Sequence, residues 1–138
     1  MIVRDATQED LDYLRLNAAE NGLKDYPRLS LTGYAKTLLV DGVPIACGGV
    51  IVLWDKVGEG WLVVGRDVNE RKVEIAYFLR NVIDETMKEL KLKRLQVAVR
   101  TDFEKGKKFV EFLDFEFEGV MHSYFPDGSN AFLYARFI

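Results

Sequence analysis

Apolar residues recur with two different periods along this chain, and the change of period predicts where helices and strands lie. Thr7 is typical of a helix N-cap, and Gly22 of the C-cap that ends the first predicted helix. A longer helical pattern covers residues 69–92, and a third helix is predicted within residues 102–115. Residues 30–35 are predicted to form a short helix or a turn.

The clearest strand pattern is a hairpin within residues 36–54. Two β-rich runs flank Asp41–Gly42, a dipeptide that favours a tight two-residue turn. Gly48–Gly49, inside the second run, indicates either a bulge or a close approach of another backbone. A turn at residues 55–58 and a third antiparallel strand over residues 58–65 are predicted to follow.

The remaining strands are predicted at both ends of the chain and between the two later helices. They cover residues 1–6, 93–100, 116–126 and 130–138, and the last two are joined through the turn sequence "PDGS". The strand–helix–strand order over residues 61–99 implies a parallel pair, whereas the hairpins imply antiparallel strands. We therefore expect one α+β domain over residues 1–138, with a mixed, mostly antiparallel central sheet, a central β-α-β parallel pair and helices on both faces.

Composition narrows the class of protein. The net charge of −3 over 138 residues does not favour a nucleic-acid binder or a membrane-surface protein. No apolar run approaches the roughly 20 residues of a membrane-spanning helix, and the N-terminus lacks a signal-peptide core. Cys47 is the single cysteine, so a reducing, cytoplasmic compartment is expected, with Cys47 buried and not a nucleophile. One histidine and one cysteine also predict no metal site.

Two stretches carry a resemblance to a known family: the opening "VRDATQEDLDYL" and the closing "LQVAVRTDFEKGKKFVEFLDFEFEGVMHSYFPDGSNAFLYARFI". With this order of elements, the whole chain resembles the GNAT superfamily of acetyl-CoA-dependent N-acyltransferases. "FLDFEFEG" replaces the Lys-Leu-Gly-Phe phrase of that family, with Asp114 where glycine is usual. More narrowly, Trp61 and the polar turn "GRDVNERKV" resemble acetyltransferase-like proteins encoded among phage virion genes, which would give a host-cytoplasm or virion location.

The resemblance implies that acetyl-CoA is the co-substrate and that an amine of a small molecule or protein is the acceptor. The acetyl group would pass directly from one to the other. In the family, the fourth and fifth strands splay apart, and the gap between them binds the pantetheine arm of the cofactor. In this sequence the resemblance places these strands at residues 61–65 and 95–99. The residues implied in cofactor binding are Val63, Val64, Gly65, Arg66, Arg71, Lys72 and Val73. The alternative is a solvated basic turn that caps a helix, since residues 69–73 contain no glycine and Asp67 and Glu70 would repel phosphate.

Two residues are candidates for proton transfer. Glu59 lies where several relatives keep a glutamate base, although the flanking glycines also fit an ordinary turn. The family's usual tyrosine acid is replaced by Val110, and Tyr124 is the best substitute; the alternative is a cross-strand aromatic pair. Strand alternation places His122 and Tyr124 on the same face, with His122 as a partnered surface residue.

The expected acceptor pocket has residues 21–30 and 123–132 as its walls. A second function remains open at this point: a catalytically inactive member of the fold, used as a binding or assembly protein of phage origin. The absent glycines and Val110 favour it. The exposed edges of a mixed sheet are also compatible with a homodimer.

Overall fold

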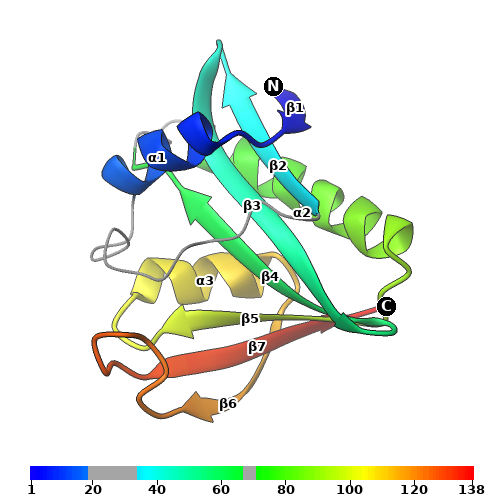
Figure 1. Ribbon diagram of the computed structural model, residues 1–138, viewed down its shortest axis with the longest axis vertical. Helices are drawn as coiled ribbons and strands as arrows, with labels where there is room; N and C mark the ends of the chain where they lie inside the picture. Colours follow the sequence, from blue (N-terminus) through cyan, green and yellow to red (C-terminus); the bar gives the residue numbers. More distant parts are fainter. Residues whose placement is uncertain (19–33, 67–70) are drawn as a thin grey trace. The chain divides into compact units, whose positions relative to one another are not determined.

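The computed structural model describes residues 1–18, 34–66 and 71–138, and its elements follow the predicted order (Figure 1). They are β1 (Ile2–Asp5), α1 (Gln8–Leu16), β2 (Tyr34–Val40), β3 (Val43–Trp54), β4 (Val57–Val64), α2 (Lys72–Glu89), β5 (Arg94–Arg100), α3 (Glu104–Phe112), β6 (Glu116–Met121) and β7 (Ala131–Phe137). Most of the short helix or turn predicted for residues 30–35 lies outside the described residues, but Tyr34 and Ala35 already belong to β2.

Within the described residues, the strands form one mixed sheet of seven strands in the order β1-β2-β3-β4-β5-β7-β6. β4 and β5 are the parallel pair, with Val57–Glu59 beside Arg94–Gln96. The pairs β1–β2, β2–β3, β5–β7 and β6–β7 are antiparallel. The predicted α+β class with a mostly antiparallel sheet is therefore confirmed.

The chain divides into two compact units, and β3 and β4 contribute residues to both. One unit comprises Met1–Ile51 and Gly60–Asn69, and the other comprises Val52–Glu59 and Glu70–Ile138. The single domain expected over residues 1–138 stays a prediction.

In the first unit, α1 begins at a capping box. Thr7 caps this helix through a reciprocal pair of bonds with Asp10, so the predicted N-cap is confirmed. The predicted end was wrong: α1 stops at Leu16 with Asn17 as its C-cap, and Gly22 lies outside the described residues. Ala18, expected in the helix, instead forms an isolated antiparallel bridge with Gly65.

The β2–β3 hairpin turns at Asp41–Gly42, as predicted. Both residues have positive φ, 51° and 77°, the signature of a turn whose twist matches the flanking strands. The bulge lies between Leu38 and Leu39, not at Gly48–Gly49. The two glycines serve the other predicted role, because Trp61 lies against them.

The second unit inserts β7 between β5 and β6. Side chains two residues apart on a strand point to the same face, so Phe132, Tyr134 and Arg136 of β7 lie on one face of this part of the sheet. α2 reaches that face through Asp84, which accepts a bond from Arg136 at 3.1 Å, and α3 through Lys107, 4.9 Å from the ring centre of Phe132. Figure 1 shows α3 running alongside β5.

Two predicted boundaries in this unit were wrong. β4 begins at Val57, because the β3–β4 turn is completed by Lys56 with a φ of 68°, so residues 57 and 58 are strand and not turn. β6 ends at Met121, before the predicted limit, because Ser123 takes a φ of 53° that a strand cannot accommodate. The predicted "PDGS" turn is confirmed: the amide of Gly128 donates to the carbonyl of Phe125 at 2.8 Å.

Candidate active site

Glu59 is a strand residue, in contrast to the turn position that its flanking glycines suggested. It lies in β4 directly beside Gln96 of β5 in the parallel register. Its side chain is partly buried, and the amide Nε2 of Gln96 donates to its Oε1 at 3.3 Å. The β4–β5 pair therefore holds a carboxylate at a defined place on the sheet.

Gln96 connects Glu59 to a second carboxylate. Nε of Arg94 donates to Oε1 of Gln96 at 3.2 Å. The two terminal nitrogens of Arg94 bind the two carboxylate oxygens of Glu118 at 3.0 and 2.6 Å. Sequence reasoning missed Gln96 and Arg94, although their separation by two residues on β5 placed them on one face.

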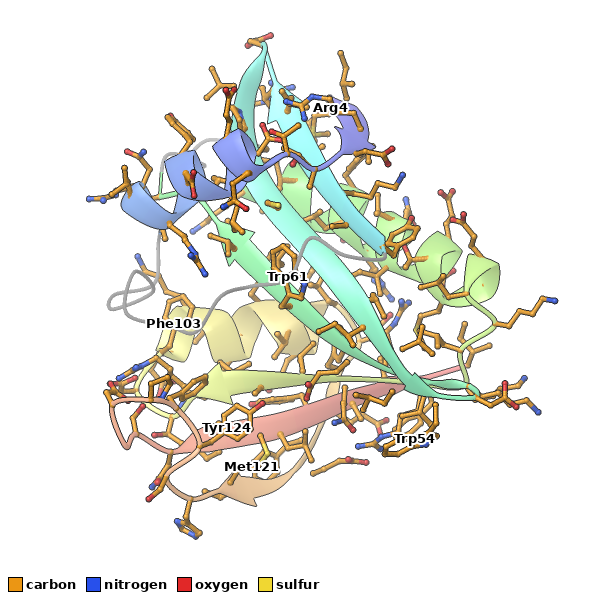
Figure 2. All side chains as sticks on the ribbon, in the orientation of Figure 1. Arg4, Trp54, Trp61, Phe103, Met121 and Tyr124 are labelled. Carbon is orange, nitrogen blue, oxygen red and sulfur yellow. The ribbon has the colours of Figure 1, made fainter. Side chains whose placement is uncertain are left out.

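Tyr124 lies in the connection between β6 and β7 and not on a strand. In the view of Figure 2 its side chain points from that connection towards the strands, and 45% of the residue is exposed. Burial, and then the negative charge of Glu59, raise the pKa of the Tyr124 phenol above its ordinary value. The two residues predicted to transfer protons therefore interact electrostatically.

The aromatic partner of Tyr124 is its chain neighbour and not a cross-strand residue. The rings of Tyr124 and Phe125 meet edge to face with centres 5.1 Å apart. The predicted alternation of His122 with Tyr124 was wrong, since His122 is an exposed turn residue beyond the end of β6.

The β6–β7 connection is fixed to β5 by Arg100. This side chain donates to Asp127 at 3.0 Å, and its guanidinium lies 5.7 Å from the ring centre of Phe125. Bonds from Ser129 and then from Arg100 lower the pKa of Asp127 to about 2. The connection that carries Tyr124 is therefore tied down by charge and hydrogen bonding. Of the two predicted acceptor walls, residues 123–132 include this segment, and residues 21–30 lie outside the described residues.

The cofactor-binding residues predicted in the second unit form the exposed start of α2. Arg71 is the N-cap but makes no side-chain capping bond, so first-turn amides such as those of Lys72 and Val73 lack a side-chain cap. Arg71 donates to Glu74 at 3.2 and 3.4 Å. The start of α2 thus offers amides and cations to an anion, while Glu74 offsets part of that charge.

The cofactor-binding residues predicted in the first unit are largely engaged by other groups. The Val63 side chain is buried in a core cluster with Leu11, Leu14 and Cys47. The amide of Gly65 donates to Ile45 at 2.9 Å. Val64 is partly buried at the end of β4.

Arg66 is also engaged, both through its backbone and through its side chain. Its amide donates to the carbonyl of Asn17 at 2.9 Å, and its guanidinium to that of Leu16 at 3.0 Å. Cys47 is buried, as predicted, and burial raises the pKa of its thiol, which disfavours the reactive thiolate.

The described part of the chain contains neither a metal-binding cluster nor a helix suited to cross a membrane. No group of three or more His, Cys, Asp or Glu side chains there could hold a metal ion. None of the helices described combines the length and apolar character needed to cross a bilayer.

Several solved structures similar to this one are described as acetyltransferases. The Ard1 protein of Thermoplasma volcanium superposes with a TM-score of 0.78 at 15% identity, over 99% of this chain and 97% of its own. The ribosomal-protein-alanine N-acetyltransferase of Brucella melitensis superposes with a TM-score of 0.76 at 15% identity, over 100% of both chains. A GNAT-family acetyltransferase of Streptococcus pneumoniae gives 0.75 at 16% identity, over 99% of this chain and 98% of its own.

The fold is that of the GNAT acetyltransferases. At these identities the likeness concerns the fold alone. The sequence matches no protein-family model, and it matches no curated protein. The narrower resemblance to phage virion proteins finds no support among these structures, which come from cellular organisms.

Proposed function

We propose that this protein is an N-acyltransferase that moves an acetyl group from acetyl-CoA directly to an amine. The observation that carries this proposal is a Glu59 carboxylate held by Gln96 on the paired strands β4 and β5 of an acetyltransferase fold, with its charge acting on the Tyr124 phenol. Acyl transfer to an amine needs a base and an acid, and these two residue types can supply them.

The chemistry assigns one proton transfer to each residue. The amine nitrogen attacks the thioester carbonyl, a C–N bond forms and the C–S bond breaks. Glu59 accepts the proton that the amine loses, and Tyr124 gives a proton to the departing thiolate. The phenol of Tyr124 is protonated at neutral pH, since the ordinary pKa of tyrosine is about 10 and its pKa here is raised above that value, so it carries a proton that it can donate.

The start of α2 is the proposed pyrophosphate site. A helix N-terminus attracts anions through its unpaired amides and its dipole, and Arg71, Lys72 and the amide of Val73 belong to the exposed first turn. Val63, Val64, Gly65 and Arg66 remain sequence-based predictions for the rest of the cofactor. For Val63 such a contact would be through its backbone, since its side chain is buried.

The acceptor in this proposal is an amine of a small molecule or a protein. One structural neighbour, from Brucella melitensis, is a ribosomal-protein-alanine N-acetyltransferase, which makes a protein amine a natural first candidate. The single buried cysteine is in keeping with a reducing compartment, so we place the reaction in the cytoplasm.

Calorimetric titration with acetyl-CoA tests the cofactor site. The unmodified protein should bind, and the double variant Arg71→Ala/Lys72→Ala should bind at least about tenfold more weakly, because charged contacts to phosphate are lost. The double variant Lys105→Ala/Lys108→Ala is the matched control, since it removes the same charge from exposed positions of α3. Equal affinity in both double variants would remove the start of α2 from the site.

Release of free thiol with a panel of amines tests the chemistry. Glu59→Gln and Tyr124→Phe should each lower kcat about a hundredfold or more, the usual contribution of general acid–base catalysis. Acetyl-CoA affinity should change little in either variant. Unchanged turnover in both would show that these residues are not the base and the acid.

A non-catalytic binding or assembly protein, of the phage type suggested by the sequence, is the second candidate. The ion pair of Arg71 with Glu74 and the engaged amide of Gly65 favour it, because both weaken a phosphate cradle. It predicts no heat of binding at millimolar acetyl-CoA, the outcome that would reject the acyltransferase.

A further inference from the structure

We propose that Gln96 is a positioning residue that holds the Glu59 carboxylate in one orientation, and that Arg94 and Glu118 lock Gln96 in turn. This inference rests on the proposed role of Glu59 as the base. It assigns a purpose to a chain of four polar side chains drawn from β4, β5 and β6.

The chain is continuous in hydrogen-bond distance. Glu59 accepts from Gln96 at 3.3 Å, and Gln96 accepts from Arg94 at 3.2 Å. Arg94 then binds both oxygens of Glu118, at 3.0 and 2.6 Å. Bidentate binding fixes the plane of a guanidinium as well as its position, so the chain is anchored at the end remote from Glu59.

The polarity of these groups permits a single orientation of the Gln96 amide. A guanidinium only donates hydrogen bonds, and an ionised carboxylate only accepts them. Gln96 must therefore turn its oxygen towards Arg94 and its nitrogen towards Glu59. Rotation of the amide by 180° would set nitrogen against guanidinium and oxygen against carboxylate, and both bonds would be lost.

The surroundings of Arg94 restrain it further. Its guanidinium lies 5.6 Å from the ring centre of Phe137 on β7. Glu118 lies in the register shift between Phe117 and Gly119, and an irregularity of this kind can re-aim a side chain. The Arg94 and Glu118 side chains are only 25% and 32% exposed, so water screens their ion pair less than a fully exposed one.

A fixed carboxylate makes a better base because the geometry for proton removal is set before the amine arrives. Gln96→Met removes both hydrogen bonds at nearly constant length. We expect a 10–100-fold loss of kcat with an unchanged KM for acetyl-CoA, by analogy with the loss seen when the hydrogen bonds that orient metal ligands are removed. Gln8→Met is the matched control, since Gln8 also donates to a carboxylate, that of Asp12 at 2.8 Å, on the exposed side of α1.

A double-mutant cycle separates positioning from general destabilisation. In a Glu59→Gln background, Gln96→Met should cause no further loss of kcat, because the base that it orients is already gone. Equal losses in both backgrounds would overturn the proposal, and so would full activity of Gln96→Met alone.

A readout independent of activity is the pair of side-chain amide resonances of Gln96 in an NMR spectrum. They should shift in Glu59→Gln and in Arg94→Met but not in Arg80→Met, which breaks an ion pair with Asp114 elsewhere in the unit. If these resonances did not shift in Glu59→Gln or in Arg94→Met, the proposal would be overturned. Absence of turnover in the unmodified protein would instead reject the proposed function, and the resonances still decide whether Gln96 orients Glu59.

Discussion

Gly49 marks a place in the sheet where a side chain of any size is excluded. A Cβ added there would lie 2.7 Å from Nε1 of Trp61 and 2.8 Å from the carbonyl oxygen of Tyr34. Both distances are well inside van der Waals contact, and one neighbour is backbone. The Trp61 indole therefore explains Gly49, whereas Gly48 lies against the backbone oxygen of Trp61 and the side chain of Leu62, each 3.0 Å from a Cβ placed there.

Gly49→Ala should lower the free energy of unfolding by about 1–3 kcal/mol, the usual cost of overpacking. Urea unfolding followed by Trp fluorescence would measure it. Gly119→Ala is the control, since a Cβ at Gly119 meets nothing within 4 Å, and a change of at most about 0.5 kcal/mol is expected. A Gly49→Ala variant as stable as the control would show that the indole moves aside freely.

Tyr124 lies at a place in the fold that differs from the one predicted for it. Alternation along a strand placed it on a sheet face beside His122, but β6 ends at Met121. The charge of Glu59 acts on Tyr124 in the β6–β7 connection, so strand alternation is not what relates the two residues. The sequence supplied the residue type, and the loop supplied its position.

At the scale of elements, Asp10 joins β1, α1 and β2. Its carboxylate accepts from Arg4 at 2.6 and 2.9 Å and from Thr37 at 2.9 Å, and it completes the capping box of α1 with Thr7. The bond from Arg4 is the main reason that the pKa of Asp10 lies well below its ordinary value, and the bonds from Thr7 and Thr37 add to it.

This depressed pKa predicts a pH dependence of stability with a definite sign. The ionised Asp10 stabilises the fold above the pKa of about 3.9 that it has when unfolded, and that contribution is lost as the pH falls towards its lower folded value. Asp10→Asn should cost about 1–3 kcal/mol at pH 7, because hydrogen bonds to a charged group are lost. The difference from the unmodified protein should shrink below about pH 4.

Denaturant unfolding from pH 7 to pH 2.5 measures this effect. Asp12→Asn is the control, because Asp12 lies on the same helix but is exposed, and it should change stability by less than about 0.5 kcal/mol. A constant difference between Asp10→Asn and the unmodified protein across that range would contradict the assignment.

At the scale of the whole molecule, acetyl-CoA should stabilise the folded state if it binds only there. At a hundred times its Kd the gain is about 2.7 kcal/mol. For a chain of 138 residues this corresponds to a rise in Tm of roughly 5–10 °C. Arg71→Ala/Lys72→Ala should lose most of that rise at the same concentration, whereas Lys105→Ala/Lys108→Ala should keep it. A Tm that does not respond to acetyl-CoA would argue for the non-catalytic alternative.

The sequence alone determined the order of the elements, the Asp41–Gly42 turn, the Thr7 cap and the fold class. These features depend on backbone preferences and side-chain periods within about ten residues, so they are encoded locally. Helix and strand ends were less well predicted. Asn17 ends α1 as its C-cap, and Lys56 and Ser123 take positive φ next to strand ends. The residue types alone do not predict these backbone conformations.

Only the tertiary structure decided which strands are neighbours, with β7 inserted between β5 and β6. It also decided that Glu59 meets Gln96 across a separation of 37 residues, and that Arg94 meets Glu118 across 24. Such contacts depend on the register of strands that are distant in sequence, and a one-residue slip would turn each side chain to the opposite face. The residue types of the candidate site were therefore visible in the sequence, while their arrangement arises from the assembled sheet.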